Sequence, residues 1–192
     1  MKKVSKKLRK PLLIWIYGSA DTGKTGVIKA LASRLRPLCS KFVEHRLGLS
    51  EVSDEIVFCQ LINYRIAMSS VGDSIKQVAE NINKFSRLHV DVIVLAARKR
   101  FDQWNIKAKM QSTLDEKAKK WLANCEIVEI PKIIQGWKEE NSIKNTILMS
   151  CSSEDLFLFL MRILKHGVSF NFKNKRKQLC SYCEISSYDL SV

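Results

Sequence analysis

The sequence predicts a layered α/β fold with a mostly parallel central sheet, a β-hairpin insertion and flanking helices. Short apolar runs alternate along the chain with segments whose apolar residues recur at helical spacing. Such alternation is typical of strands that are joined by helices. The chain has 192 residues with 46% apolar content, which suffices for one buried core.

The first strand is expected at residues 12–17 and the first helix at 25–35. Residues 12–17 form a continuous apolar run, as in strands that are buried on both faces. The helix is predicted by one apolar stripe, formed by Val27, Ile28, Leu31 and Leu35. Pro37 closes it.

The sequence pattern in the middle of the chain predicts a hairpin, a helix and a further strand. A short strand is expected at 41–44, and two β-type runs at 55–61 and 64–69 are separated by Ile62-Asn63, a spacing suited to a hairpin. An amphipathic helix is expected at 74–85, and a buried strand at 90–96.

The last part of the chain predicts a helix at 114–122, a strand at 126–130 and a helix at 153–165. The last helix carries the richest apolar stripe and should pack on the sheet. We therefore expect one domain over residues 1–167, with a basic leader at 1–10, and a basic tail at 168–192.

A glycine-rich motif lies between the first strand and the first helix. It reads Gly18-Ser19-Ala20-Asp21-Thr22-Gly23-Lys24-Thr25 and matches G-x-x-x-x-G-K-[ST] at every fixed position. The glycines let successive backbone amides point inward, and the amino end of the helix, with Gly26, adds partial positive charge. Lys24 would then reach the β- and γ-phosphates of a nucleoside triphosphate, and the Thr25 hydroxyl would be a Mg²⁺ ligand. The alternative is a glycine turn with an exposed lysine.

With this motif between a strand and a helix, the chain resembles the P-loop NTPase superfamily, and its small kinase-like and NTPase members in particular. The resemblance extends over residues 12–130 through the alternation of strands and helices. It implies the three-layer P-loop fold, Mg²⁺ as cofactor, and ATP or GTP as ligand. The chain departs from the family pattern because no run of four apolar residues ends directly in Asp, so binding is predicted more directly than hydrolysis.

A carboxylate is expected beside the loop to orient magnesium-bound water. Asp73 is the first choice, because it follows an apolar segment in a glycine-containing turn, whereas Asp91 flanks a strand at its amino end. Glu44 occupies the place where the resembling small-molecule kinases keep an acidic base. Ser69 and Ser70 are candidates for contacts with phosphate or Mg²⁺. Each of these residues has an alternative role as a turn, helix-cap or surface group.

Two arginines, Arg98 and Arg100, follow the strand at 90–96 at the edge where parallel sheets bind ligands. Phosphoryl transfer needs positive charge near the migrating group, so the predicted catalytic set is Lys24, Asp73 and Arg98. The alternative is that both arginines are solvated in a basic loop. The stretch 98–109 is the candidate for a lid over an acceptor, and Lys132 is a candidate contact to the base.

The formal net charge of +14 predicts attraction to nucleic acid or other polyanions. Basic residues cluster at 2–10 and 173–177, and solvated termini are the alternative explanation. The expected partners are a nucleoside triphosphate, a protein partner and nucleic acid at this basic surface. No apolar run approaches the roughly 20 residues that cross a bilayer, so no membrane partner is expected.

The cysteine pattern favours a reducing, cytoplasmic location. Six cysteines lack framework spacing, and Cys39, Cys59 and Cys125 fit as small buried hydrophobes. Cys180 and Cys183 form a lone C-x-x-C pair, for which a metal or redox role stays open.

Two functions compete on the sequence alone. The first is an enzyme that hydrolyses the triphosphate or transfers its γ-phosphate. The second is a nucleotide-sensing regulatory module of a larger complex, in which the triphosphate orders loops and is not turned over. Two features favour it: no apolar run ends directly in Asp, and the termini are basic. A nucleic-acid-associated NTPase is a third reading.

Overall fold

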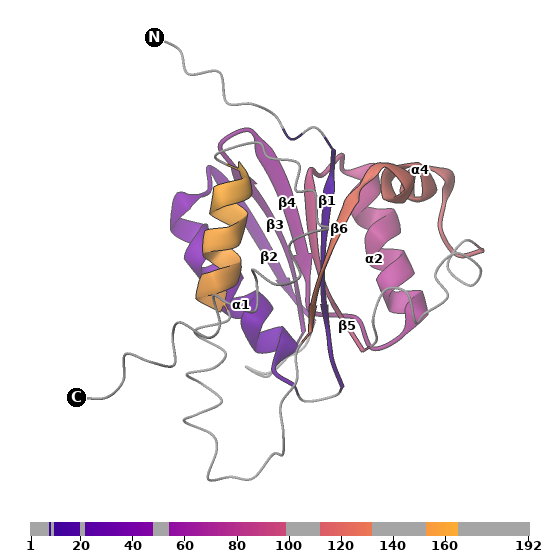
Figure 1. The fold of residues 1–192 in the computed structure, drawn as a ribbon, viewed down its shortest axis with the longest axis horizontal. Coiled ribbons are helices and arrows are strands. Elements are labelled where there is room, and N and C mark those ends of the chain that lie inside the picture. The colour runs from indigo at the N-terminus through magenta and orange to yellow at the C-terminus, as the bar shows by residue number, and fades with distance from the viewer. Residues whose placement is uncertain are drawn as a thin grey trace, which may run out of the picture.

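The computed structural model describes residues 8, 10–19, 22–47, 54–98, 112–131 and 153–164. Its six strands form one sheet in the order β2-β3-β4-β5-β1-β6 (Figure 1). β1 (Leu12–Tyr17) pairs in parallel with β5 (Val92–Ala97) and with β6 (Glu126–Pro131), and β4 (Tyr64–Ser69) pairs in parallel with β5. The predicted α/β class with a mostly parallel sheet is confirmed.

One strand of the sheet is reversed. β3 (Glu55–Leu61) is antiparallel to both of its neighbours, β2 (Lys41–Arg46) and β4. β3 and β4 form the predicted hairpin around Ile62-Asn63, and Ile62 takes the left-handed conformation with a φ of 57°. The first residues of β3 therefore lie at the edge where β4 ends, and the Ser70 amide donates to the Glu55 carbonyl at 3.1 Å.

Helices cover both faces of the sheet. α1 (Lys24–Leu35) and the helix at residues 153–164 lie on one face, and α2 (Ile75–Arg87) and α4 (Glu116–Asn124) lie on the other (Figure 1). Successive side chains of β1 point to opposite faces, so Ile14 packs in the core beneath α1 while Trp15 packs beneath α2. Both are fully buried, as expected for a strand covered on both sides.

Local signals explain where the helices begin and end. Ser74 caps α2 in a capping box with Gln77, which agrees with the predicted start. α4 begins at Glu116 rather than at 114, because the Asp115 carboxylate accepts the Ala118 amide at 2.8 Å and caps the helix there. α1 ends at Leu35, and a short 3₁₀ turn, η1 (Arg36–Leu38), follows it and contains Pro37. The second strand continues to Arg46, beyond the expected end at Glu44.

Three cysteines in the described residues pack among apolar side chains. Cys59 is buried, and Cys39 and Cys125 are partly buried against the two halves of the core. Burial raises the pKa of all three thiols, and that of Cys125 reaches about 12. The prediction that they act as small hydrophobes is confirmed. Cys180 and Cys183 lie outside the described residues, as do the predicted tail and most of the basic leader.

No helix within the described ranges is both long enough and apolar enough to cross a membrane.

The loop between β4 and α2 passes very close to the end of β5. A Cβ atom placed on Gly72 would lie 1.7 Å from the carbonyl oxygen of Ala96, which is fixed in the central sheet. Glycine is therefore required at this position for the loop to cross β5. The crossing places Ser70 and Asp73 at the carboxyl ends of the strands.

We predict that Gly72→Ala lowers the free energy of unfolding by at least about 2 kcal/mol, because β5 or the loop must move to admit the methyl group. Urea denaturation of the wild type and the variant measures this change. Gly26→Ala, within α1, is the control and should be neutral or stabilising by up to about 1 kcal/mol. Equal stability of Gly72→Ala and the wild type would contradict the close approach.

Candidate functional site

The glycine-rich loop begins beside the end of β5 and leads directly into α1. The Gly18 amide donates to the Ala97 carbonyl at 3.1 Å, so the loop leaves the sheet at its carboxyl edge. Gly23 is the N-cap of α1 and has a φ of 78°, in the left-handed region that favours glycine. The amino end of α1 thus lies at this edge of the sheet, and the amino end of a helix favours anions. Ala20 and Asp21 lie outside the described residues.

The Lys24 side chain folds back over this loop. Its ammonium group donates to the carbonyls of Gly18 at 3.0 Å and Ser19 at 2.5 Å, and it lies 3.4 Å from the Thr22 hydroxyl. The Thr22 hydroxyl in turn donates to the Ser19 carbonyl at 3.0 Å. Lys24 is only 9% exposed, and a buried charge needs such partners. The loop therefore holds a positive charge at the amino end of a helix.

Within the described part of the chain, Thr25 contacts the carboxylate of Asp54. The Thr25 hydroxyl donates to Asp54 Oδ1 at 3.3 Å, and the Ser70 hydroxyl donates to the same oxygen at 2.9 Å. Ser70 is fixed in turn, because its hydroxyl oxygen accepts the Glu55 amide at 2.9 Å. Asp54 thus joins α1, the start of β3 and the end of β4.

The oxygens around Asp54 suit Mg²⁺. This ion binds hard oxygen ligands at about 2.0–2.1 Å in octahedral geometry, which places adjacent ligands about 3 Å apart. The separation of 3.3 Å between Thr25 Oγ1 and Asp54 Oδ1 is close to that value. Among the described residues there is no group of three or more His, Cys, Asp or Glu side chains that could hold a metal. A site completed by phosphate and water needs fewer protein ligands than that.

Sequence reasoning did not identify Asp54. Metal-side carboxylates were expected after the ends of strands, whereas Asp54 directly precedes the start of β3. Because β3 is antiparallel, its beginning lies at the same edge as the end of β4. The available signal was an acidic residue directly before the first strand of a predicted hairpin.

Asp73 and Arg98 meet at the same edge of the sheet. Arg98 Nε donates to Asp73 Oδ1 at 2.8 Å, and Arg98 directly follows Ala97, the partner of the loop residue Gly18. The hydrogen bond from Arg98 lowers the pKa of Asp73, and the positive charges of Arg98 and Lys24 lower it further. Two members of the predicted catalytic set are therefore in contact, and the charge of the third, Lys24, acts on Asp73. The contact of Asp73 is with Arg98, however, whereas Thr25 contacts Asp54.

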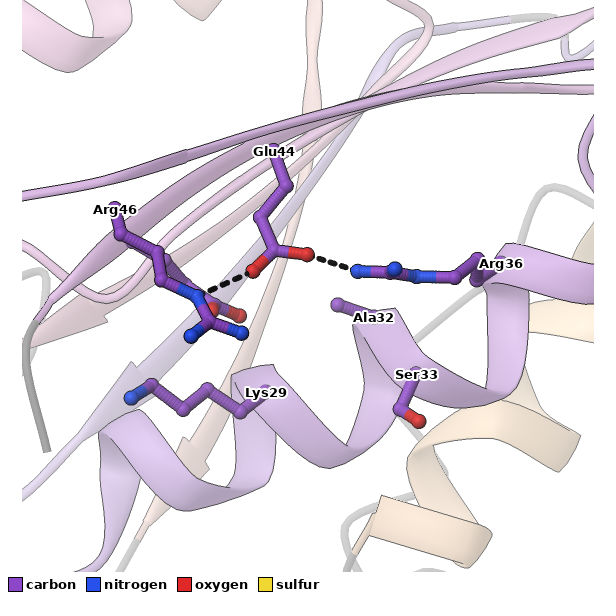
Figure 2. Close-up of a pocket in the computed structure, with 7 residues that line it drawn as sticks. Lys29, Ala32, Ser33, Arg36, Glu44 and Arg46 are labelled. Atoms are coloured by element: carbon purple, nitrogen blue, oxygen red, sulfur yellow. Dashed lines mark hydrogen bonds and ion pairs between the residues drawn. The ribbon is translucent and has the colours of Figure 1, made fainter. Parts of the chain in front are cut away.

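Glu44 lies away from the glycine-rich loop. Figure 2 shows its carboxylate between two arginines, Arg36 at the end of α1 and Arg46 at the end of β2; Arg46 Nε lies 2.9 Å from it. Arg36 is about 16 Å along the helix axis from Thr25, at 1.5 Å per residue. The group lines a cavity of about 320 Å³ together with Lys29, Ala32, Ser33 and Glu55. The structure does not bring Glu44 to the site.

The remaining candidates are also placed. Ser69 is buried and its hydroxyl oxygen accepts from Asn81 of α2, whereas the Ser70 hydroxyl donates to Asp54. Asp91 lies at the opposite edge, where its carboxylate accepts the Arg65 amide at 2.9 Å, in agreement with its exclusion. Arg100, Lys132 and most of the predicted lid lie outside the described residues.

Comparison of the chain with models of protein families, with curated proteins and with solved structures gave no match. The site is therefore interpreted from its own geometry.

We predict that Arg98→Ala raises the pKa of Asp73, because the main group that stabilises the carboxylate is lost. Because the pKa of Asp73 is lower in the folded than in the unfolded chain, the ion pair stabilises the fold at pH values above the unfolded-state pKa. This stabilisation is lost as the pH falls through the lower, folded-state pKa. Carboxyl-carbon NMR titration measures the shift. Arg87→Ala is a matched control, since Arg87 pairs with Asp115 at 2.7 Å on α2 and should leave Asp73 unchanged. An unmoved Asp73 titration in Arg98→Ala would contradict the assignment.

Proposed function

We propose that this chain is a small P-loop protein that binds a nucleoside triphosphate with Mg²⁺ and cleaves or transfers its γ-phosphate. One observation carries the proposal. The Lys24 ammonium group is buried on a glycine-rich loop at the amino end of α1, and the next residue, Thr25, directs its hydroxyl to the carboxylate of Asp54. Positive charge, helix amides and metal-type oxygens thus adjoin one another.

The phosphates are proposed to bind at the amino end of α1. There the amides of the first helical turn and the partial charge of the helix favour anions. The Lys24 ammonium donates to the carbonyls of Gly18 and Ser19, and phosphate oxygens are stronger acceptors for a charged donor. The proposed step is that Lys24 exchanges these carbonyls for the β- and γ-phosphate oxygens.

Thr25 and Asp54 are proposed to hold the metal side of the nucleotide. The chemistry that Mg²⁺ would supply there is positive charge that offsets the charge developing on the phosphates. The Thr25 hydroxyl would be a direct ligand, and Asp54 would bind the ion or orient its water. Asp54 takes this role in the proposal in place of Asp73, because it is the carboxylate that Thr25 contacts.

Arg98 is proposed to stabilise charge on the transferring group. It stands at the end of β5, beside the start of the loop, where a cation can lower the barrier to phosphoryl transfer. Its partner Asp73 then orients the guanidinium group. Turnover, unlike binding, depends on this placement of Arg98.

We predict that Lys24→Ala weakens ATP binding in the presence of Mg²⁺ by about 10- to 100-fold, as expected for the loss of charge-assisted hydrogen bonds. Isothermal titration with ATP and with GTP measures this and establishes the base preference. Asp54→Asn should weaken binding only when Mg²⁺ is present. Glu44→Gln, which changes a carboxylate far from the loop, should bind as the wild type does.

The same titrations separate the alternatives. If Asp73→Asn loses the effect of Mg²⁺ and Asp54→Asn keeps it, then Asp73 is the metal-side carboxylate. Tight ATP binding without turnover would assign the chain the nucleotide-sensing role. If neither ATP nor GTP binds the wild type, the proposed function is wrong.

A further inference from the structure

Helix α2 buries an asparagine whose side chain bonds to the loop that follows β4. Asn81 is 6% exposed, and its amide nitrogen donates to the Ser69 hydroxyl oxygen at 3.1 Å and to the Val71 carbonyl at 2.9 Å. Burying an amide costs free energy unless it is hydrogen-bonded, so these two bonds keep the loop against the helix. Ser69 is the last residue of β4 and Val71 lies in the loop, so the two partners flank Ser70.

Two further contacts hold the loop, one to Ser69 and one to the end of β5. The Val71 amide donates to the Ser69 hydroxyl oxygen at 3.2 Å, which closes a local ring of hydrogen bonds with Asn81. Gly72 then lies against the carbonyl of Ala96 at the end of β5. The position of Ser70 is thereby determined by Asn81 and by the strand ends.

Ser70 transmits this placement to the carboxylate of Asp54. Its hydroxyl donates to Asp54 Oδ1 at 2.9 Å, the oxygen that also accepts the Thr25 hydroxyl. If the loop relaxed, Ser70 would keep its hydrogen bonds to Glu55 but lose the restraint from the loop, and the Asp54 carboxylate would gain rotational freedom. The chain of contacts therefore runs from Asn81 through the loop to Ser70 and Asp54.

We propose that Asn81 is a positioning residue for the metal side of the nucleotide site, acting through the β4–α2 loop on Ser70 and Asp54. The inference rests on the proposed function and adds to it a residue on a helix that does not touch the nucleotide. Groups that orient metal-side ligands commonly contribute 10- to 100-fold in metal affinity or activity.

The chain offers a matched control on the same helix. Asn83 also makes two hydrogen bonds, donating to the Thr113 carbonyl at 2.9 Å and accepting the Asp115 amide at 2.9 Å. These bonds join α2 to the start of α4, not to the β4–α2 loop. Asn83→Ala and Asn81→Ala therefore remove equal numbers of bonds, but only one of them loosens the loop.

The test is ATP titration of the full chain in EDTA and in excess Mg²⁺, with the melting temperature of each variant. For Asn81→Ala we expect metal-free ATP affinity within about twofold of the wild type, and a gain on adding Mg²⁺ that is about tenfold smaller. Asn83→Ala should keep the full gain at a similar melting temperature. Ser69→Ala removes one of the two acceptors of Asn81 with little change in volume, and it should show a smaller loss of the same kind.

The outcomes are distinct. If Asn81→Ala fails to fold, Ser69→Ala decides: a reduced Mg²⁺ gain supports the inference and an unchanged gain overturns it. If Asn81→Ala keeps the gain, or loses metal-free affinity to the same extent, the positioning role is wrong while the proposed function stands. If the wild type binds no ATP under either condition, both are wrong.

Discussion

The reversal of β3 determines which groups meet at the edge of the sheet. Five strands share one direction and β3 runs against them, so its first residues lie beside the last residues of β4. This geometry brings Asp54 within hydrogen-bonding distance of Ser70, and α1 brings Thr25 to the same carboxylate. Three segments that are distant in sequence thereby converge on one oxygen. In a sheet with β3 parallel, Asp54 would lie at the opposite edge.

The edge carries a second contact, between Asp73 and Arg98, and both contacts depend on the β4–α2 loop. Gly72 allows that loop to cross the end of β5, and Asn81 bonds to it from α2. The fold thus supplies a loop that is fixed on two sides between the Asp54–Ser70 and Asp73–Arg98 contacts. Under the proposed function, a loop held in this way would need little rearrangement when the nucleotide binds.

Much of the fold could be predicted because buried parallel strands and amphipathic helices have strong local patterns. The bounds of β1, β3 and β4 match the sequence-based expectation, as does the capping box of α2. The residues of the candidate site were harder to predict from the sequence, because the direction of a strand depends on contacts between distant parts of the chain. Asp54 was missed for that reason, and Glu44 was expected near the loop although it pairs with Arg36 at the far end of α1. The meeting of Asp73 and Arg98 was expected, but not that they would bind each other.

A crystal structure of the chain with Mg²⁺ and a non-hydrolysable ATP analogue tests the proposed site most directly. We expect phosphates at the amino end of α1 against Lys24, with the Thr25 hydroxyl on the metal and Asp54 on the metal or its water. Phosphates bound elsewhere would contradict the proposed function. A metal held by Asp73, with Asp54 directed away from it, would contradict the role assigned to the reversed strand.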